Sequence, residues 1–212
     1  MNGLQRKNRQ ESMDYVSSML EENYPYTAHY QTMYVYNAPK ILFTPEECDR
    51  IIRIGHAQRL EPQRNQYQLA DVSDFYMHVA YIPPCPETEF VYDRLWELIV
   101  AMNTRYWNFE LYDFAEPLKF TEYEKTNGTC IHTDNNMHDS IYRKLTVIVQ
   151  LSEETNYVGG EVVIYNTKYP KTLFKQRGTV AIFPTYILHK VEPILCGMRN
   201  SLVAFAHGPP FR

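Results

Sequence analysis

The fold is decided by residues 145–151, which read LTVIVQL. Every odd position of this stretch is aliphatic, a period of two that is typical of a β-strand with one face against a core. Similar short stretches recur at close spacing, at 118–124, 129–134, 161–165, 179–183 and 201–207. Turn dipeptides separate them, such as Asn127-Gly128 and Arg177-Gly178. The pattern predicts a sandwich or barrel of antiparallel sheets.

Upstream of this β-rich part, the sequence predicts two helices with a strand between them. The first begins at Thr44-Pro45-Glu46-Glu47, which combines an N-cap hydroxyl, a proline at the first helical position and a capping-box glutamate. The second helix spans 87–106, and residues 73–82 form the strand. The apolar positions of the first helix are Cys48, Ile51, Ile52 and Gly55. We therefore expect one domain over 39–212, with a helical support at 39–116 and a barrel core at 117–212.

The first 38 residues differ from the rest because they are rich in Asn, Gln, Met and Tyr. A short helix over 11–22 is expected here, and nothing in this segment indicates chemistry. We interpret residues 1–38 as an N-terminal arm that packs on the domain or on a second subunit, so that the protein is a monomer or a homodimer. A lid over the substrate is the alternative role.

Composition and charge exclude several classes of function. The 212 residues include 21 Lys and Arg against 25 Asp and Glu, a net charge of −4 that gives no basic surface for nucleic acid or anionic membranes. The four cysteines form no Cys-x-x-Cys pair, which indicates free thiols in a reducing compartment. No stretch resembles a membrane span or a signal peptide. We expect a cytoplasmic protein without nucleic-acid or membrane partners.

One motif in the β-rich part can bind a metal. His132-Thr133-Asp134 lies at the end of a predicted strand, where residues two apart project from the same face and can reach one ion. His189, just past another predicted strand, is the best-placed third ligand. Two histidines and one carboxylate on one face of an octahedral ion form the ligand set of non-haem Fe(II) oxygenases.

These residues also have plain structural interpretations. Asp134 can cap a turn, and His189 can be a hydrogen-bonded histidine at the end of a strand. His138 with Asp139, and His207, are rival ligands, although neither lies in a comparable strand context.

Arg199-Asn200-Ser201 follows His189 and opens the last predicted strand. A guanidinium and a hydroxyl two residues apart lie on the same strand face, where they can bind one carboxylate together. An arginine at the start of a strand is most often a solvated charge. In this position after His189, we interpret Arg199 as an anchor for a dicarboxylate.

Together these residues make the sequence resemble the Fe(II)/2-oxoglutarate-dependent dioxygenases, and within them the prolyl 4-hydroxylase-like group that includes small bacterial and phage hydroxylases. The resemblance covers residues 42–212 and is strongest in five motifs. They are HTDN at 132–135, RKLTVIVQLS at 143–152, YVGGE at 157–161, GTVAIFPTYILH at 178–189 and HGPPFR at 207–212.

The resemblance implies a mainly β fold, a double-stranded β-helix of the jelly-roll or cupin-like type, backed by N-terminal helices. In that fold His132, Asp134 and His189 would bind Fe(II). Arg199, helped by Ser201, would pair with the distal carboxylate of 2-oxoglutarate. The implied location is the cytoplasm of a bacterium or of a phage-infected host.

Tyr123 matches the family tyrosine that hydrogen-bonds the cosubstrate, although packing inside a barrel explains it nearly as well. The implied enzyme is a 2-oxoglutarate-dependent dioxygenase that uses O2 to hydroxylate an unactivated C–H bond of a prolyl or other peptidyl residue, with release of succinate and CO2. Ascorbate is a candidate bound reductant. The resemblance requires no catalytic residue beyond the iron ligands.

Two departures from the family pattern concern the substrate. Asp71-Val72-Ser73 stands where prolyl hydroxylase relatives usually have Arg-x-Ser, and Arg199 stands where collagen-type enzymes often have lysine. A free amino acid or another small molecule is therefore an alternative substrate. A non-catalytic cupin-like binding module is the alternative of a different class. A zinc hydrolase with the same three ligands is a third, which would leave Arg199 and Ser201 unexplained.

Overall fold

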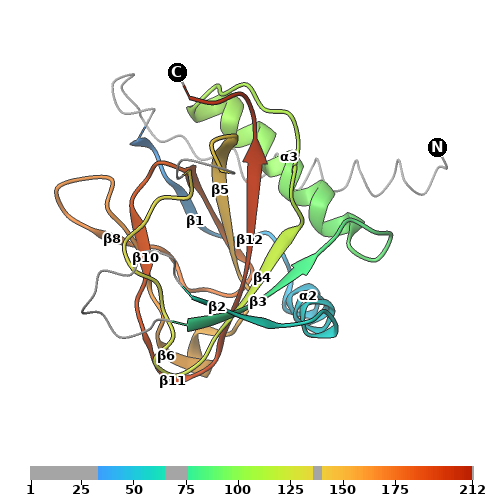
Figure 1. The fold of residues 1–212 in the computed structure, drawn as a ribbon, viewed down its shortest axis with the longest axis vertical. Helices are drawn as coiled ribbons and strands as arrows, with labels where there is room; N and C mark the ends of the chain where they lie inside the picture. The colour runs from blue at the N-terminus through green and yellow to red at the C-terminus, as the bar shows by residue number, and fades with distance from the viewer. Residues whose placement is uncertain (1–32, 65–75, 136–139, 212) are drawn as a thin grey trace.

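The computed structural model describes residues 33–64, 76–135 and 140–211, whose elements are arranged as in Figure 1. Seven strands form one antiparallel sheet in the order β1-β9-β5-β12-β4-β3-β2. Their bounds are β1 (Tyr36–Ile41), β2 (Glu61–Arg64), β3 (Tyr76–Ile82), β4 (Leu118–Tyr123), β5 (Arg143–Gln150), β9 (Thr179–Pro184) and β12 (Arg199–His207). The helix expected over 11–22 lies outside the described residues. The expected end of the arm, at residue 38, falls inside β1.

Two smaller antiparallel sheets pack against one face of the large sheet. Their strands are β6 (Tyr157–Gly159) with β11 (Ile194–Gly197), and β10 (His189–Val191), β7 (Val162–Ile164) and β8 (Lys171–Thr172). Ile148 and Phe183 of the large sheet share an apolar cluster with Val162 and Ile194 of the small ones. The prediction of a mainly β chain with supporting helices is confirmed.

Helix α2 (Pro45–Ala57) packs on the other face of the large sheet and begins at the predicted capping box. The Thr44 hydroxyl accepts from the Glu47 N–H at 3.3 Å, and the Glu47 carboxylate accepts from the Thr44 N–H at 2.9 Å. Gly55 allows a close approach to the sheet, because a Cβ there would lie 2.4 Å from the Phe120 ring. The buried positions are Cys48, Ile51, Ile54 and Gly55, so Ile54 takes the place that the sequence pattern assigned to Ile52.

Helix α3 (Glu89–Tyr106) covers the same face and starts two residues later than expected. The reason is a turn at Cys85, whose N–H donates to the Thr88 hydroxyl at 2.9 Å before the helix begins. Arg94 of α3 donates to both carboxylate oxygens of Glu47, at 2.7 and 2.9 Å. This ion pair fixes α3 to the start of α2.

The prediction of a regular strand over 129–134 is wrong. His132 makes only an isolated bridge with His189, through backbone hydrogen bonds of 2.9 and 3.0 Å in the two directions. The Thr129 N–H donates to the Val191 carbonyl, and the Asp134 N–H donates to the Thr185 carbonyl. Between successive pairs, the two segments advance by different numbers of residues, and such mismatches interrupt a ladder. The segment still runs beside β10.

The two faces of the large sheet differ in chemistry. Residues paired across neighbouring strands lie on the same face, and successive residues alternate between faces. The face toward the helices is mostly apolar and includes Phe120, Val147 and Leu202, with Glu122 as a buried polar exception bonded to His56 of α2. The opposite face carries buried polar side chains, which are Thr121, Tyr123, Gln150, Arg199 and Ser201. The candidate site lies on this second face.

Candidate metal centre

His132, Asp134 and His189 come together between the sheets, with one ligand atom of each within 4.8 Å of the others. His132 Nε2 lies 3.6 Å from Asp134 Oδ1, and His189 Nε2 lies 3.4 Å from Asp134 Oδ2. The other ring nitrogens face backbone carbonyls, His132 Nδ1 at 2.8 Å and His189 Nδ1 at 3.0 Å. Because a carbonyl only accepts, each Nδ1 must carry a proton, so Nε2, which faces Asp134, is the ring nitrogen that can bind a metal ion. This arrangement of donors fits a divalent metal ion.

The protonation states of the cluster also fit a metal site. Burial raises the pKa of Asp134, but the two histidines and a 2.7 Å hydrogen bond from the Thr146 hydroxyl outweigh it, and the pKa lies below its usual value. Burial lowers the pKa of His189, an effect that Asp134 only partly opposes. An ionised carboxylate beside neutral imidazole is what metal coordination needs.

A second group of residues fixes the backbone of Asp134. Arg143 Nη1 donates to the Asp134 carbonyl at 3.3 Å, and its other nitrogens donate to the two carboxylate oxygens of Glu116, both at 2.6 Å. His207 Nε2 lies 3.1 Å from the same carboxylate, so this rival ligand contacts Glu116 and lies outside the metal cluster. His138 and Asp139 lie outside the described residues.

Arg199 is 1% exposed, although it is a charged residue. Its Nε and Nη2 donate to Gln150 Oε1 at 3.2 and 2.8 Å, while its buried Nη1 has no partner among the described residues. A buried guanidinium with an unused N–H group is costly unless a ligand completes its hydrogen bonds. Gly160 lies against it, because a Cβ there would be 3.1 Å from the Arg199 Cδ. These features fit an anchor for a carboxylate.

Tyr123 and Ser201 flank Arg199 on this face. Tyr123 is paired across the strands with Arg199, whose guanidinium carbon lies 5.3 Å from the Tyr123 ring centroid. Burial raises the pKa of Tyr123 despite the opposing charge of Arg199, so the phenol keeps its proton as a donor. The Ser201 hydroxyl lies 2.7 Å from the Thr121 hydroxyl, which itself donates to the Ser201 carbonyl. Ser201 is therefore already held within the sheet.

Three residues around the cluster were not predicted from the sequence: Gln150, Thr146 and Lys119. Gln150 and Thr146 are polar residues inside an aliphatic strand, and this interruption is the signal that could have found them. Lys119 precedes Thr121 and Tyr123 on the same face of β4. Burial lowers the pKa of Lys119, and the charges of Asp134 and Glu116 oppose this effect.

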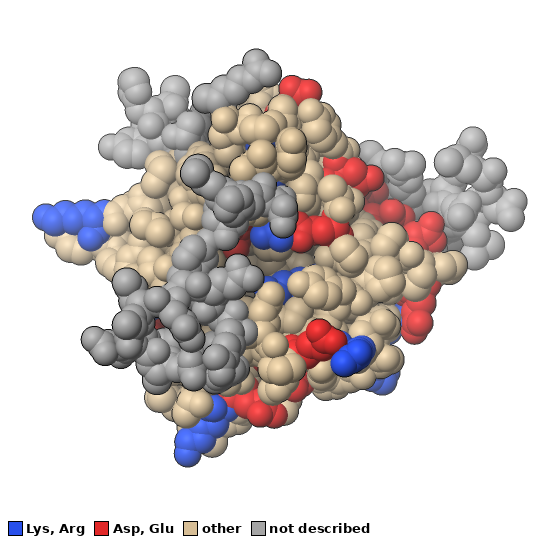
Figure 2. Space-filling view, in the orientation of Figure 1, with Lys and Arg blue, Asp and Glu red and all other residues tan. Residues whose placement is uncertain are grey.

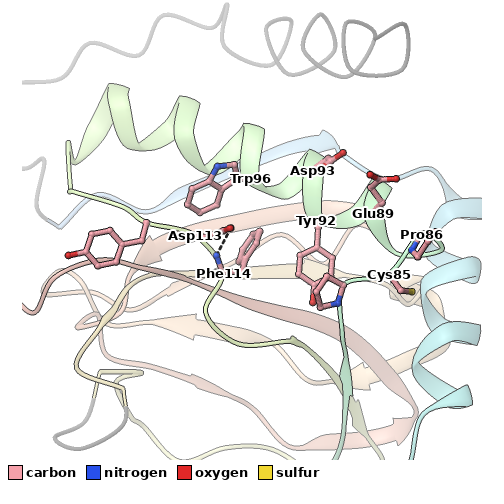
Figure 3. Close-up of a pocket in the computed structure, with 10 residues that line it drawn as sticks. Cys85, Pro86, Glu89, Tyr92, Asp93, Trp96, Asp113 and Phe114 are labelled. Carbon is pink, nitrogen blue, oxygen red and sulfur yellow. Dashed lines mark hydrogen bonds between the residues drawn. The ribbon is translucent and has the colours of Figure 1, made fainter. Parts of the chain in front are cut away.

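A separate groove lies on the helical side of the molecule (Figure 3). Tyr92, Trp96 and Phe114 form its aromatic part, and Phe114 contacts both other rings edge-on. The Tyr92 hydroxyl donates to the Ile82 carbonyl at 2.7 Å and accepts from the Leu118 N–H at 3.1 Å. Through these two hydrogen bonds, Tyr92 of α3 holds the end of β3 and the start of β4. None of the predicted site residues lines the groove.

The fold and the cluster define a class: a two-layered antiparallel β protein that gathers two imidazoles and a carboxylate between its layers, as non-haem iron proteins do. Solved structures share the whole fold. An oxidoreductase of the 2OG-Fe(II) oxygenase family from Burkholderia pseudomallei aligns with a TM-score of 0.63 at 19% identity, covering 94% of this chain and 92% of that one. A prolyl-4-hydroxylase from Pseudomonas putida also gives 0.63, at 17% identity and 93% and 99% coverage. The predicted double-stranded β-helix is confirmed.

Sequence comparison points in the same direction. Residues 118–207 match the model of the 2OG-Fe(II) oxygenase superfamily. A PKHD-type hydroxylase of Shewanella baltica is 33% identical over 92 residues, and one of Prochlorococcus marinus is 30% identical over 92 residues. The matched part covers 42% and 43% of this chain, and only 41% and 42% of those relatives. In the described ranges, neither helix combines the length and hydropathy that a membrane crossing needs.

Proposed function

We propose that this protein is an Fe(II)- and 2-oxoglutarate-dependent dioxygenase that hydroxylates an unactivated C–H bond and releases succinate and CO2. The observation that carries the proposal is the combination of a buried His-Asp-His cluster with a buried, incompletely paired Arg199 on the same side of the sheet. The pKa of Tyr123 responds to the charges of both Asp134 and Arg199, which supports one shared site for the two parts. A structural ion pair would account for neither part.

Each residue has a defined part in this function. His132, Asp134 and His189 would hold Fe(II), which when bound supplies the activation of O2. Thr146 and Arg143 keep the Asp134 carboxylate oriented and ionised.

The residues around Arg199 would hold the cosubstrate. Gln150 orients the Arg199 guanidinium by accepting hydrogen bonds from it. The remaining N–H group of Arg199 would then donate to the distal carboxylate of 2-oxoglutarate. Tyr123 keeps a proton to donate to the same molecule. Apolar residues between the sheets, such as Ile148 and Phe183, would exclude water from the surroundings of the metal and the cosubstrate.

The proposed substrate is a prolyl or other peptidyl residue. A prolyl hydroxylase from Trichoplax adhaerens, solved with a peptide fragment of the hypoxia inducible factor oxygen degradation domain, has the same fold, with a TM-score of 0.62 at 17% identity. A free amino acid remains the second candidate, because the sequence departs from the prolyl hydroxylase pattern at Asp71. Residues 39–212 are proposed as the catalytic unit.

The direct test is to add Fe(II) and 2-oxoglutarate without oxygen and to measure the weak visible charge-transfer band of the chelated complex. We expect the band in the wild type and a weakened affinity for 2-oxoglutarate in Arg199→Ala. Arg177→Ala is a matched control, because this arginine pairs instead with Asp49 and Glu153 at the surface. Absence of the band, or unchanged affinity in Arg199→Ala, would contradict the proposal. Incubation with prolyl peptides, free proline and cell extract, followed by a search for a mass gain of one oxygen, then identifies the substrate.

A further inference from the structure

Lys119 lies on the same face of β4 as Tyr123, yet no step of the proposed function uses it. It is paired with Val203 on β12 and with Tyr81 on β3, and it shares a face of β4 with Thr121 and Tyr123. Residues two apart on a strand are separated by about 7 Å. Lys119 therefore continues the line of side chains that begins beside Arg199, one step beyond Thr121.

The ammonium group of Lys119 has no dedicated counter-ion. No hydrogen bond or ion pair joins its Nζ to a residue within 33–64, 76–135 or 140–211. The two carboxylates whose charge reaches it are those of Asp134 and Glu116. Glu116 is already bound by Arg143 and His207, and Asp134 faces the two histidines of the metal cluster. In Figure 2, basic and acidic atoms meet in the hollow in the middle of the face shown.

A metal ion in the cluster would reduce the negative charge that faces the Lys119 ammonium group. Coordination would take up the negative charge of Asp134, and Arg143 adds a positive charge nearby. A half-buried lysine is most stable when an anion pairs with its ammonium group. Val203 and Tyr81, which are paired with Lys119 on the neighbouring strands, add largely apolar side chains to the same face of the sheet. The surroundings suit a carboxylate that is carried on an apolar body.

We propose that Lys119 binds a carboxylate of the substrate, so that the enzyme selects molecules with a negative charge close to the C–H bond that reacts. This inference rests on the proposed function and adds the substrate class to it. The carboxylate comes from one of two sources: the main-chain carboxylate of a free amino acid or a C-terminal residue, or the side chain of Asp or Glu in a peptide.

The test uses the anaerobic complex of the full chain with Fe(II) and 2-oxoglutarate, whose visible band shifts when a molecule binds beside the metal. The probes are two matched pairs: L-proline with L-prolinamide, and a capped Glu-Pro peptide with its Gln-Pro counterpart. We expect the acid of at least one pair to bind about tenfold more tightly than its amide. Lys119→Met removes this preference, and Lys119→Arg keeps most of it. Lys171→Met, at an exposed lysine of β8, is the control and keeps the preference.

The outcomes distinguish a wrong role for Lys119 from a wrong proposed function. A preference confined to the first pair identifies a main-chain carboxylate, and one confined to the second identifies a side-chain carboxylate. The proposal is overturned if acid and amide bind alike in both pairs, if no acid binds, or if the preference survives in Lys119→Met while the band is intact. Absence of the band before any probe is added overturns the proposed function itself, and this inference with it.

Discussion

Phe120 and Thr121 are neighbours on β4, yet they serve opposite faces of the large sheet. Phe120 is fully buried against the helices, where its ring contacts Gly55. Thr121 is equally buried but hydrogen-bonds Ser201 in the layer that holds the candidate site. The helical face is stabilised mainly by apolar contact, with a 2.7 Å hydrogen bond between His56 of α2 and Glu122 of β4. The other face carries buried polar side chains, and among them Arg199 Nη1 has no partner within the described residues. Substitutions on the helical face should therefore lower the free energy of unfolding, and substitutions on the other face should lower the affinity for metal or cosubstrate.

The largest effect is expected for Phe120→Ala. Removing a fully buried phenylalanine from the helical face should lower the free energy of unfolding by about 3–5 kcal/mol. Chemical denaturation of the metal-free protein measures this change. At a temperature where the variant is still folded, its affinity for 2-oxoglutarate should equal that of the wild type. A large loss of affinity in the folded variant would show that the two faces are not independent.

The next prediction uses Thr146 and Val147, which are adjacent on β5 and face opposite sides. Thr146→Val removes the 2.7 Å hydrogen bond to Asp134, so the affinity for Fe(II) should fall about 10- to 100-fold, as is typical when a residue that orients a ligand is lost. Metal titration followed by the visible band provides the measurement.

Val147→Thr is the matched control for this experiment. It buries a hydroxyl among the apolar residues of the helical face, at a cost of about 1–3 kcal/mol in stability. Its metal affinity should not change once the protein is folded. The comparison between faces would be wrong if the two variants gave the same pattern of losses.

A smaller effect is expected for Tyr123→Phe. This change keeps the buried ring and removes one hydroxyl, so the affinity for 2-oxoglutarate should fall by roughly three- to tenfold, the equivalent of one hydrogen bond. Isothermal titration with Mn(II) in place of Fe(II) measures it. Unchanged affinity would show that Tyr123 does not bind the cosubstrate and only packs inside the barrel.

The smallest effect concerns the pH dependence of stability. Hydrogen bonds from His207 and Arg143 hold the pKa of Glu116 below its usual value, although burial acts in the opposite direction. The stability that this carboxylate contributes is therefore present above the unfolded pKa of about 4.3 and lost as the pH falls through the folded pKa. Urea titrations between about pH 6 and pH 3 measure how far the free energy of unfolding falls on acidification, which we call the acid limb. In Glu116→Gln this fall should be smaller by about 1 kcal/mol. The exposed Glu87→Gln should leave the acid limb as in the wild type.

Much of the fold followed from local signals. The capping box at Thr44 and the alternation in 145–151 each encode an element within a few residues, and both predicted elements are present. β6, β8, β10 and β11 have at most four residues each, too few for a period to emerge from the sequence. They pair with one another and with the equally short β7, and the large sheet opposite them provides the apolar core.

The candidate site was predictable to the extent that its chemistry is unusual. His132, Asp134 and His189 stand out by type and spacing, and the structure brings them together. Gln150 and Lys119 were missed because their roles depend on register: each lies beside a residue of β12 that is distant in sequence. Alternation assigns a side chain to a face, but only pairing identifies its neighbour.

The isolated bridge between His132 and His189 also bears on how the chain can be lengthened. Backbone hydrogen bonds between these residues fix the two imidazoles relative to each other, whatever the length of the chain that connects them. Within that connection, residues 167–170 are exposed and follow β7. Exposed loops of this kind tolerate insertion. A reporter peptide or a whole guest domain placed after Lys168 should therefore leave the distance between the histidines unchanged, which makes this loop the natural attachment point for engineering.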